Sequence, residues 1–172
     1  MSPDGDWEKV TAVVDSGAGE NVMPENAVKF IPIVPTARSK AGRGFCGPSG
    51  EHIKNYGQKK VEVKTAEGQV RMTTWQVASV KRPLMSVSRM TAAGNDVNLS
   101  DKQPHIVNKK NGQKTALRKE GNVFVVDLWI RMPPPPGLPS SGTSSRAPRA
   151  RRNNDMEMDC ITKPGFTRQA PW

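Results

Sequence analysis

A short apolar segment that runs directly into Asp-Ser-Gly restricts the fold of this chain more than any other feature. Residues 10–14 are apolar apart from one threonine and favour a buried strand, because β-branched side chains suit a pleated surface. Asp15 then falls at the end of the strand, where the chain must turn. Gly17 frees the backbone for that turn and lets N–H groups approach the carboxylate, while Ser16 adds a hydroxyl. Ala18 leaves space above the carboxylate.

This order of strand, carboxylate and glycine is how an aspartic peptidase presents its catalytic group at the floor of a cleft. The triplet alone is weak, because Asp-Ser/Thr-Gly is a common turn sequence and occurs by chance in roughly one chain in ten of this length. The apolar run before it, near the start of the folded part, favours the catalytic interpretation over an ordinary turn.

Three stretches of the chain carry a resemblance to a known family. Residues 13–18 read V-V-D-S-G-A, residues 47–50 read G-P-S-G, and residues 83–90 read P-L-M-S-V-S-R-M. Together they resemble the retropepsin family, in particular the protease segment of copia-type retrotransposon polyproteins, over about residues 8–130. Ser86 stands where many retropepsins have glycine, and copia-type relatives share this serine.

The resemblance implies specific roles for these residues. Asp15 is expected to be the catalytic residue, and Ser16, Gly17 and Ala18 to complete the active-site loop. In the family, the residue at the Ser16 position hydrogen-bonds across a dimer axis. A glycine-rich flap hairpin closes over an extended peptide, which adds as a strand. The flap candidates are Gly47, Pro48, Ser49 and Gly50, for which an ordinary surface turn is the alternative.

A single aspartate presented in this way predicts a homodimer. Two facing carboxylates that share one proton can activate water and protonate the leaving amide, and aspartic proteases are the standard example of such a dyad. Asp96, Asp101 and Asp127 are not followed by Ser/Thr-Gly. About 125 ordered residues are also too few for two lobes. We therefore expect two copies of Asp15 to meet across a two-fold axis.

The chain is basic along its whole length. The formal net charge is 26 − 16 = +10, of which residues 133–172 contribute 6 − 3 = +3 and residues 1–132 contribute 20 − 13 = +7. Such a surface attracts polyanions, so non-specific RNA contact is one expectation and a merely solvated basic surface is the other. The sequence shows no aromatic-rich basic stripe and no RNA-binding motif.

Cysteine and histidine usage predicts neither a disulfide framework nor a metal site. Cys46 and Cys160 lie far apart in the chain, which favours a reducing compartment. His52 and His105 have no partner at metal-ligand spacing, so no metal and no cofactor are expected. Neither a signal-peptide pattern nor an apolar run of membrane length occurs. We expect a cytoplasmic protein that makes no membrane contact.

Short strands separated by turns predict an all-β fold, a small retropepsin-like closed barrel with one short helix followed by a disordered tail. The expected domains are a polar lead-in (1–7), the protease domain (8–100), a β extension packed on or following it (101–132) and a Pro/Ser/Arg-rich tail (133–172). Strands are expected at 30–34, 61–64, 70–77, 97–99, 105–107, 114–117 and 122–128, and a helix at 86–93. Candidates for pocket walls are Tyr56, Trp75 and Cys46, with core packing the alternative for the aromatics.

Three functions remain open at this point. The first is an aspartic endopeptidase that processes the polyprotein encoding it, with an extended peptide or polyprotein as substrate. The second is a catalytically inactive, retroelement-derived scaffold kept for dimerisation or peptide binding. The third is a basic RNA-associated module, for which the net charge and the arginines of the tail are the reason.

Overall fold

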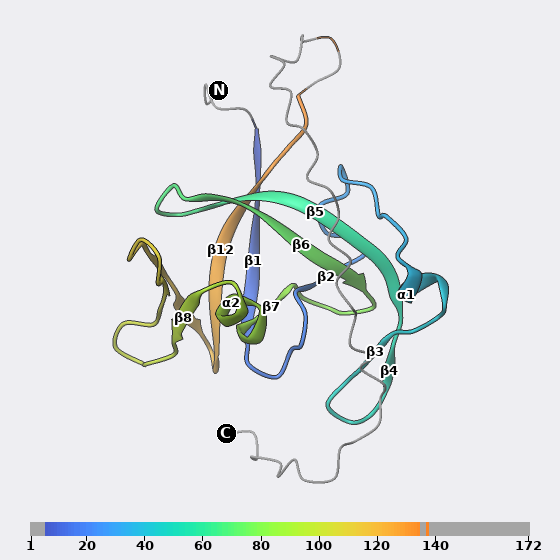
Figure 1. The fold of residues 1–172 in the computed structure, drawn as a ribbon, viewed down its shortest axis with the longest axis horizontal. Coiled ribbons are helices and arrows are strands. Elements are labelled where there is room, and N and C mark those ends of the chain that lie inside the picture. The colour runs from blue at the N-terminus through green and yellow to red at the C-terminus, as the bar shows by residue number, and fades with distance from the viewer. Residues whose placement is uncertain (1–5, 135–136, 138–172) are drawn as a thin grey trace. The chain divides into compact units, whose positions relative to one another are not determined.

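Strands dominate the chain, and the described residues include only two short helices (Figure 1). The computed structural model describes residues 6–134 and 137, so most of the expected disordered tail and most of the polar lead-in lie outside the described residues. The strands are β1 (Trp7–Asp15), β2 (Val22–Pro24), β3 (Phe45–Cys46), β4 (His52–Ile53), β5 (Asn55–Thr65), β6 (Val70–Ala78), β7 (Leu84–Ser86), β8 (Asn95–Asn98), β9 (His105–Asn108), β10 (Lys114–Ala116), β11 (Arg118–Glu120) and β12 (Val123–Arg131). The helices are α1 (Ala37–Lys40), which the sequence did not predict, and α2 (Val87–Ala92).

The main sheet contains seven strands in the order β1-β7-β2-β6-β5-β12-β11, and β1 also pairs with β12. The pairings therefore run from β1 through β7, β2, β6, β5 and β12 back to β1. Two of them, β1 with β7 and β2 with β6, are parallel, and the others are antiparallel. The parallel pairing of β1 places Asp15 beside Ser86.

β1 has the alternating burial expected of a strand that covers a core. Val10, Ala12 and Val14 are buried, as predicted from the apolar run. The strand begins at Trp7, earlier than expected, because Trp7 pairs with Arg131 of β12. The described end of the lead-in is thus part of the sheet.

Within residues 101–132, β11 and β12 belong to the same sheet as the Asp15 strand. β12 lies between β1 and β5, with Leu128 opposite Val10 on one side and Thr65 on the other. Both segments are also part of one compact unit. The extension expected at 101–132 therefore supplies a central strand.

A smaller sheet of β10, β9 and β8 follows α2 in the chain. Ile106 of β9 and Leu117 after β10 are buried with Met90 of α2 in the core cluster that contains Trp75. The three strands of this sheet were predicted from the sequence, with ends that differ by one or two residues. Their apolar side chains extend the core of the main sheet.

The β5–β6 hairpin and α2 confirm the two clearest local patterns in the sequence. The hairpin turns at residues 66–68, where Gly68 has φ +83°. α2 begins after its N-cap Ser86 and is followed by Gly94 at φ +85°.

The strand predicted at 30–34 is wrong. This segment forms turns, and only Val34 makes an isolated bridge, to Gln58 of β5. Pro32 and Pro35 have no N–H to donate to a neighbouring strand, which explains why the apolar residues around them do not extend a sheet.

A buried lysine holds the turn before this segment. Lys59 is 2% exposed, and its Nζ donates to the carbonyl oxygens of Ala27 (2.9 Å) and Val28 (3.0 Å). Burial lowers the pKa of Lys59, an effect that Glu8 and Glu25 partly oppose. Val28 has φ 53°, an uncommon conformation for a β-branched residue, and these bonds help to fix it.

Candidate active site

Asp15 lies at the end of a strand with its carboxylate accessible. The residue is half-buried, and the backbone N–H of Gly17 donates to its Oδ1 (2.7 Å). A Cβ at Gly17 would lie 3.2 Å from this oxygen, so glycine permits the close approach of the backbone. The carboxylate is thus oriented by one N–H group and still open to water.

The rest of the predicted loop surrounds this carboxylate. Ser16 and Gly17 are exposed, and Ala18 is half-buried. Within the part of the chain that the structure describes, the Ser16 hydroxyl makes no hydrogen bond, so it is available to a partner. The carbonyl of Ala18 accepts a hydrogen bond (2.6 Å) from the hydroxyl of Ser86.

Ser86 connects the loop to β7 and α2. It is fully buried, and its Oγ both donates to Ala18 and accepts from the N–H of Arg89 (3.2 Å) as the N-cap of α2. Its own N–H donates to Oδ1 of Asn21 (2.9 Å). The sequence showed this serine only as a departure from glycine. Its position at the start of the predicted helix is the signal that could have revealed the capping role.

Two further residues of the loop were missed from the sequence. The carbonyl of Asn21 accepts from the N–H of Gln76 in β6 (2.8 Å). Glu20 forms an ion pair with Arg89, whose Nε donates to Oε2 of the glutamate (2.8 Å), with a second contact through Nη2. The partners lie more than fifty residues apart in the chain, and no local pattern marks them. Together these contacts fix the loop against three elements.

The flap candidates form the turn of the β3–β4 hairpin. The N–H of Gly47 donates to the carbonyl of Glu51 (2.9 Å), and the N–H of Gly50 donates to that of Gly47 (2.9 Å). Gly50 has φ +82°, which favours glycine. Pro48 and Ser49 between them are exposed. A hairpin forms at the predicted place, its tip is held by contacts within the turn, and both a flap and an ordinary surface turn fit this geometry.

The base of this hairpin is anchored by α1. Arg38 donates from Nη2 to the carbonyl of Gly44 (2.8 Å), and its guanidinium lies 4.6 Å from the centre of the Phe45 ring. Figure 1 shows the hairpin and the loop after β1 at the same lower end of the molecule. The two predicted parts of the site are therefore brought to one end.

The three predicted wall residues have different environments. Trp75 is fully buried and donates from Nε1 to the hydroxyl of Thr73 (2.9 Å), so core packing holds for it. Tyr56 is half-buried and lines a cavity of about 250 Å³ beside Pro24 and Val80. Cys46 is disulfide-bonded. The argument from cysteine usage to a reducing compartment therefore loses its support.

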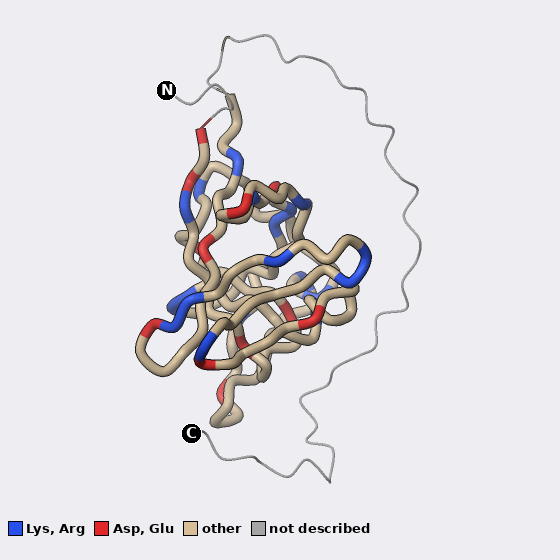
Figure 2. Tube along the Cα trace, turned by 90° about the vertical axis from the view of Figure 1, so that its left-hand side faces the viewer, with Lys and Arg blue, Asp and Glu red and all other residues tan. Residues whose placement is uncertain are grey.

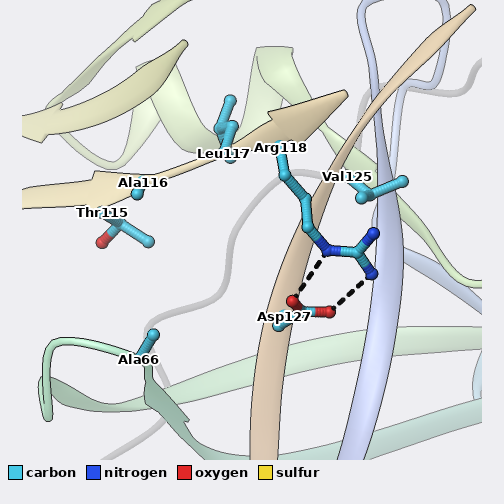
Figure 3. Close-up of a pocket in the computed structure, with 7 residues that line it drawn as sticks. All are labelled: Ala66, Thr115, Ala116, Leu117, Arg118, Val125 and Asp127. Atoms are coloured by element: carbon cyan, nitrogen blue, oxygen red, sulfur yellow. Dashed lines mark hydrogen bonds and ion pairs between the residues drawn. The ribbon is translucent and has the colours of Figure 1, made fainter. Parts of the chain in front are cut away.

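A second cavity, of about 150 Å³, is lined by residues of β10, β11 and β12 (Figure 3). Asp127 lies on its wall and is tightly held by hydrogen bonds. Arg118 donates to both oxygens of Asp127, from Nε (2.9 Å) and Nη2 (3.1 Å), and the hydroxyl of Thr11 donates to Oδ1 (2.7 Å). The hydrogen bond from Arg118 lowers the pKa of Asp127 to about 2, and that from Thr11 adds to the effect. The same pairing raises the pKa of Arg118. This carboxylate is saturated with donors.

Comparison with known proteins gives no relative: no family model, no curated protein and no solved structure matches the chain. Across residues 6–134, no cluster of three or more His, Cys, Asp or Glu side chains is placed to hold a metal ion. Neither described helix has the length and apolar character needed to cross a membrane.

Proposed function

We propose that this protein is a hydrolase, an aspartic endopeptidase of the retropepsin kind that acts as a homodimer on extended peptide or polyprotein segments. The observation that carries the proposal is Asp15: an accessible carboxylate at a strand end, oriented by the Gly17 N–H. Its loop is fixed through Ser86 and Asn21, as a catalytic group requires. A rigid loop costs little reorganisation during reaction.

Two copies of Asp15 would share the chemistry. One carboxylate takes a proton from a water molecule while the oxygen of that water attacks the peptide carbonyl carbon. The other carboxyl group, which is protonated, donates its proton to the departing amide nitrogen. The exposed Ser16 hydroxyl of each copy is available to hydrogen-bond across the axis. No cofactor takes part in these steps.

The strand pairings support the same fold family. Because the pairings return from β12 to β1, we infer that the main sheet closes as a small barrel with Asp15 at one end. The β3–β4 hairpin at that end is the proposed flap. The hydrogen bonds of its turn join residues of the hairpin to one another, which suits a segment that closes on substrate as one unit.

Peptide-library cleavage tests the proposal. The purified full chain is incubated at mildly acid to neutral pH beside Asp15→Asn and the control Asp101→Asn, whose carboxylate is an exposed partner of Lys119. The wild type and the control should cleave, and Asp15→Asn should not. Equal cleavage by wild type and Asp15→Asn, or no cleavage by a demonstrated wild-type dimer, contradicts the proposal.

Oligomeric state and inhibitor binding separate this function from an inactive scaffold. Sedimentation should show a dimer, and a strict monomer contradicts the shared dyad. A pepstatin-type inhibitor should bind the wild-type dimer, because it occupies the place of the tetrahedral intermediate. An inactive scaffold would dimerise without binding the inhibitor.

A further inference from the structure

The outer face of the main sheet gathers aromatic and basic side chains from three strands. In β1, β12 and β5, alternate side chains point into the core, among them Val10, Leu128 and Val63. The intervening side chains therefore lie on the opposite, outer face. We define the basic face as Trp7, Lys9, Lys60, Lys64, Trp129 and Arg131.

The strand register places five of these residues in two neighbouring rows, and Lys60 lies on the same face of β5, four residues before Lys64. Trp129 lies opposite Lys9 of β1 and opposite Lys64 of β5. Trp7 lies opposite Arg131 in the next row. Adjacent strands are about 4.8 Å apart, so each indole has a cationic side chain within reach on a neighbouring strand.

The indole rings hold the cationic groups in place. The Nζ of Lys64 lies 4.3 Å from the centre of the Trp7 ring, and the guanidinium of Arg131 lies 5.1 Å from it. The Nζ of Lys9 lies 5.6 Å from the centre of the Trp129 ring. Such contacts order long side chains at the surface before any partner binds.

The basic face keeps a positive charge after its ion pairs are counted. Glu62 pairs with Arg131 (3.2 Å), and Asp127 pairs with Lys9 (3.7 Å). Four cations against two carboxylates leave 4 − 2 = +2. Lys60 and Lys64 form no ion pair with any described residue. Figure 2 shows that Lys and Arg are spread over several segments of the described chain.

We propose that the basic face binds single-stranded nucleic acid without sequence preference. Lys60 and Lys64, which form no ion pair with a described residue, complement phosphates, and the half-buried Trp129 indole offers a planar surface on which an unpaired base can stack. Bases in a duplex are paired and stacked on one another, so paired nucleic acid cannot make these stacking contacts. This site does not depend on the proposed peptidase function.

Binding of a labelled, unstructured RNA strand to the full chain tests the site by fluorescence anisotropy between about 50 and 200 mM salt. Lys60→Gln/Lys64→Gln should weaken binding several-fold and reduce the slope of log affinity against log salt by about 1.4, since each lost phosphate contact contributes about 0.7. Lys60→Gln alone should give about half of this change. Because Lys60→Gln removes no side-chain contact within the described chain, a loss of binding in this variant cannot be attributed to misfolding.

The control Lys109→Gln/Lys110→Gln removes the same charge from the turn after β9 and should leave binding nearly unchanged. Trp129→Leu should weaken binding with little change in salt slope, because stacking releases few counterions. Wild-type affinity of the Lys60/Lys64 variant, or an equal loss in the control, overturns the proposal. Equal affinity for RNA, duplex and polyglutamate, unaffected by Trp129→Leu, would show a surface for acidic polymers and would also overturn it.

Discussion

Asp15 and Asp127 stand at two places on the same pair of strands, and their surroundings are opposite. The Asp127 carboxylate accepts from Arg118 and Thr11 and lies near Lys9, which leaves it ionised and occupied. Among the described residues, the Asp15 carboxylate accepts one hydrogen bond, from the Gly17 N–H. The Asp127 carboxylate is the centre of a hydrogen-bond network. Around Asp15, the hydrogen bonds fix the backbone of the loop and leave the carboxylate open to water.

This difference separates a structural aspartate from one suited to chemistry. A carboxylate saturated by donors holds its proton poorly and cannot exchange it with a substrate near neutral pH. A carboxylate with unused oxygen lone pairs can accept a proton from water. If the two aspartates divide these roles, substitutions near Asp15 should mainly lower peptide cleavage, and substitution of Asp127 should mainly lower stability.

Replacing each aspartate by asparagine is the most direct test. Asp15→Asn should lower peptide cleavage by roughly 10²–10⁴-fold, the contribution of a positioned acid or base, while the far-UV circular dichroism stays that of the wild type. Asp127→Asn should retain most of the cleavage activity. A reversed result, with activity lost only in Asp127→Asn, would contradict this division of roles.

Ser86→Ala should release the loop that carries Asp15. The carbonyl of Ala18 and the N–H of Arg89 would each lose a buried partner, which costs about 1–3 kcal/mol in the free energy of unfolding. Activity at a temperature where the variant is still folded should fall as well. Ser88→Ala is the matched control, since Ser88 is exposed on the same helix. Equal effects in urea unfolding of the two variants would contradict the capping role.

Asp127→Asn should lower stability by a smaller amount. The amide loses the charge that Arg118 and Lys9 face, and partial exposure of the site limits the loss to about 1 kcal/mol. Urea unfolding measures the change. A stability unchanged within error would show that the network contributes nothing measurable.

The same network should give a pH signature. The pKa of Asp127 is about 2 in the folded chain against 3.8 normally, so its stabilising effect is complete above about pH 4 and is lost as the pH falls towards 2. Thermal unfolding of the wild type should therefore approach that of Asp127→Asn over this range. If the difference between the two proteins were constant from pH 5 to about 2, Asp127 would not have a lowered pKa.

Local sequence determined the elements whose causes are local. The apolar run predicts β1 as a buried strand, although Val13 is only half-buried, and Asp-Ser-Gly predicts the turn after it. The turn at residues 66–68 predicts the β5–β6 hairpin, and the positions of Ser86 and Gly94 predict the bounds of α2. Each of these signals acts within a few residues, through side-chain period or backbone preference.

Tertiary structure alone decided which of these elements meet. The register that sets Asp15 beside Ser86, the insertion of β12 next to β1 and the bond from Ser86 to Asn21 join residues far apart in the chain. The same is true of the basic face, whose tryptophans come from opposite ends of the described residues. Strand pairing depends on how the whole set of apolar faces is buried together, and a single segment carries no record of its partner.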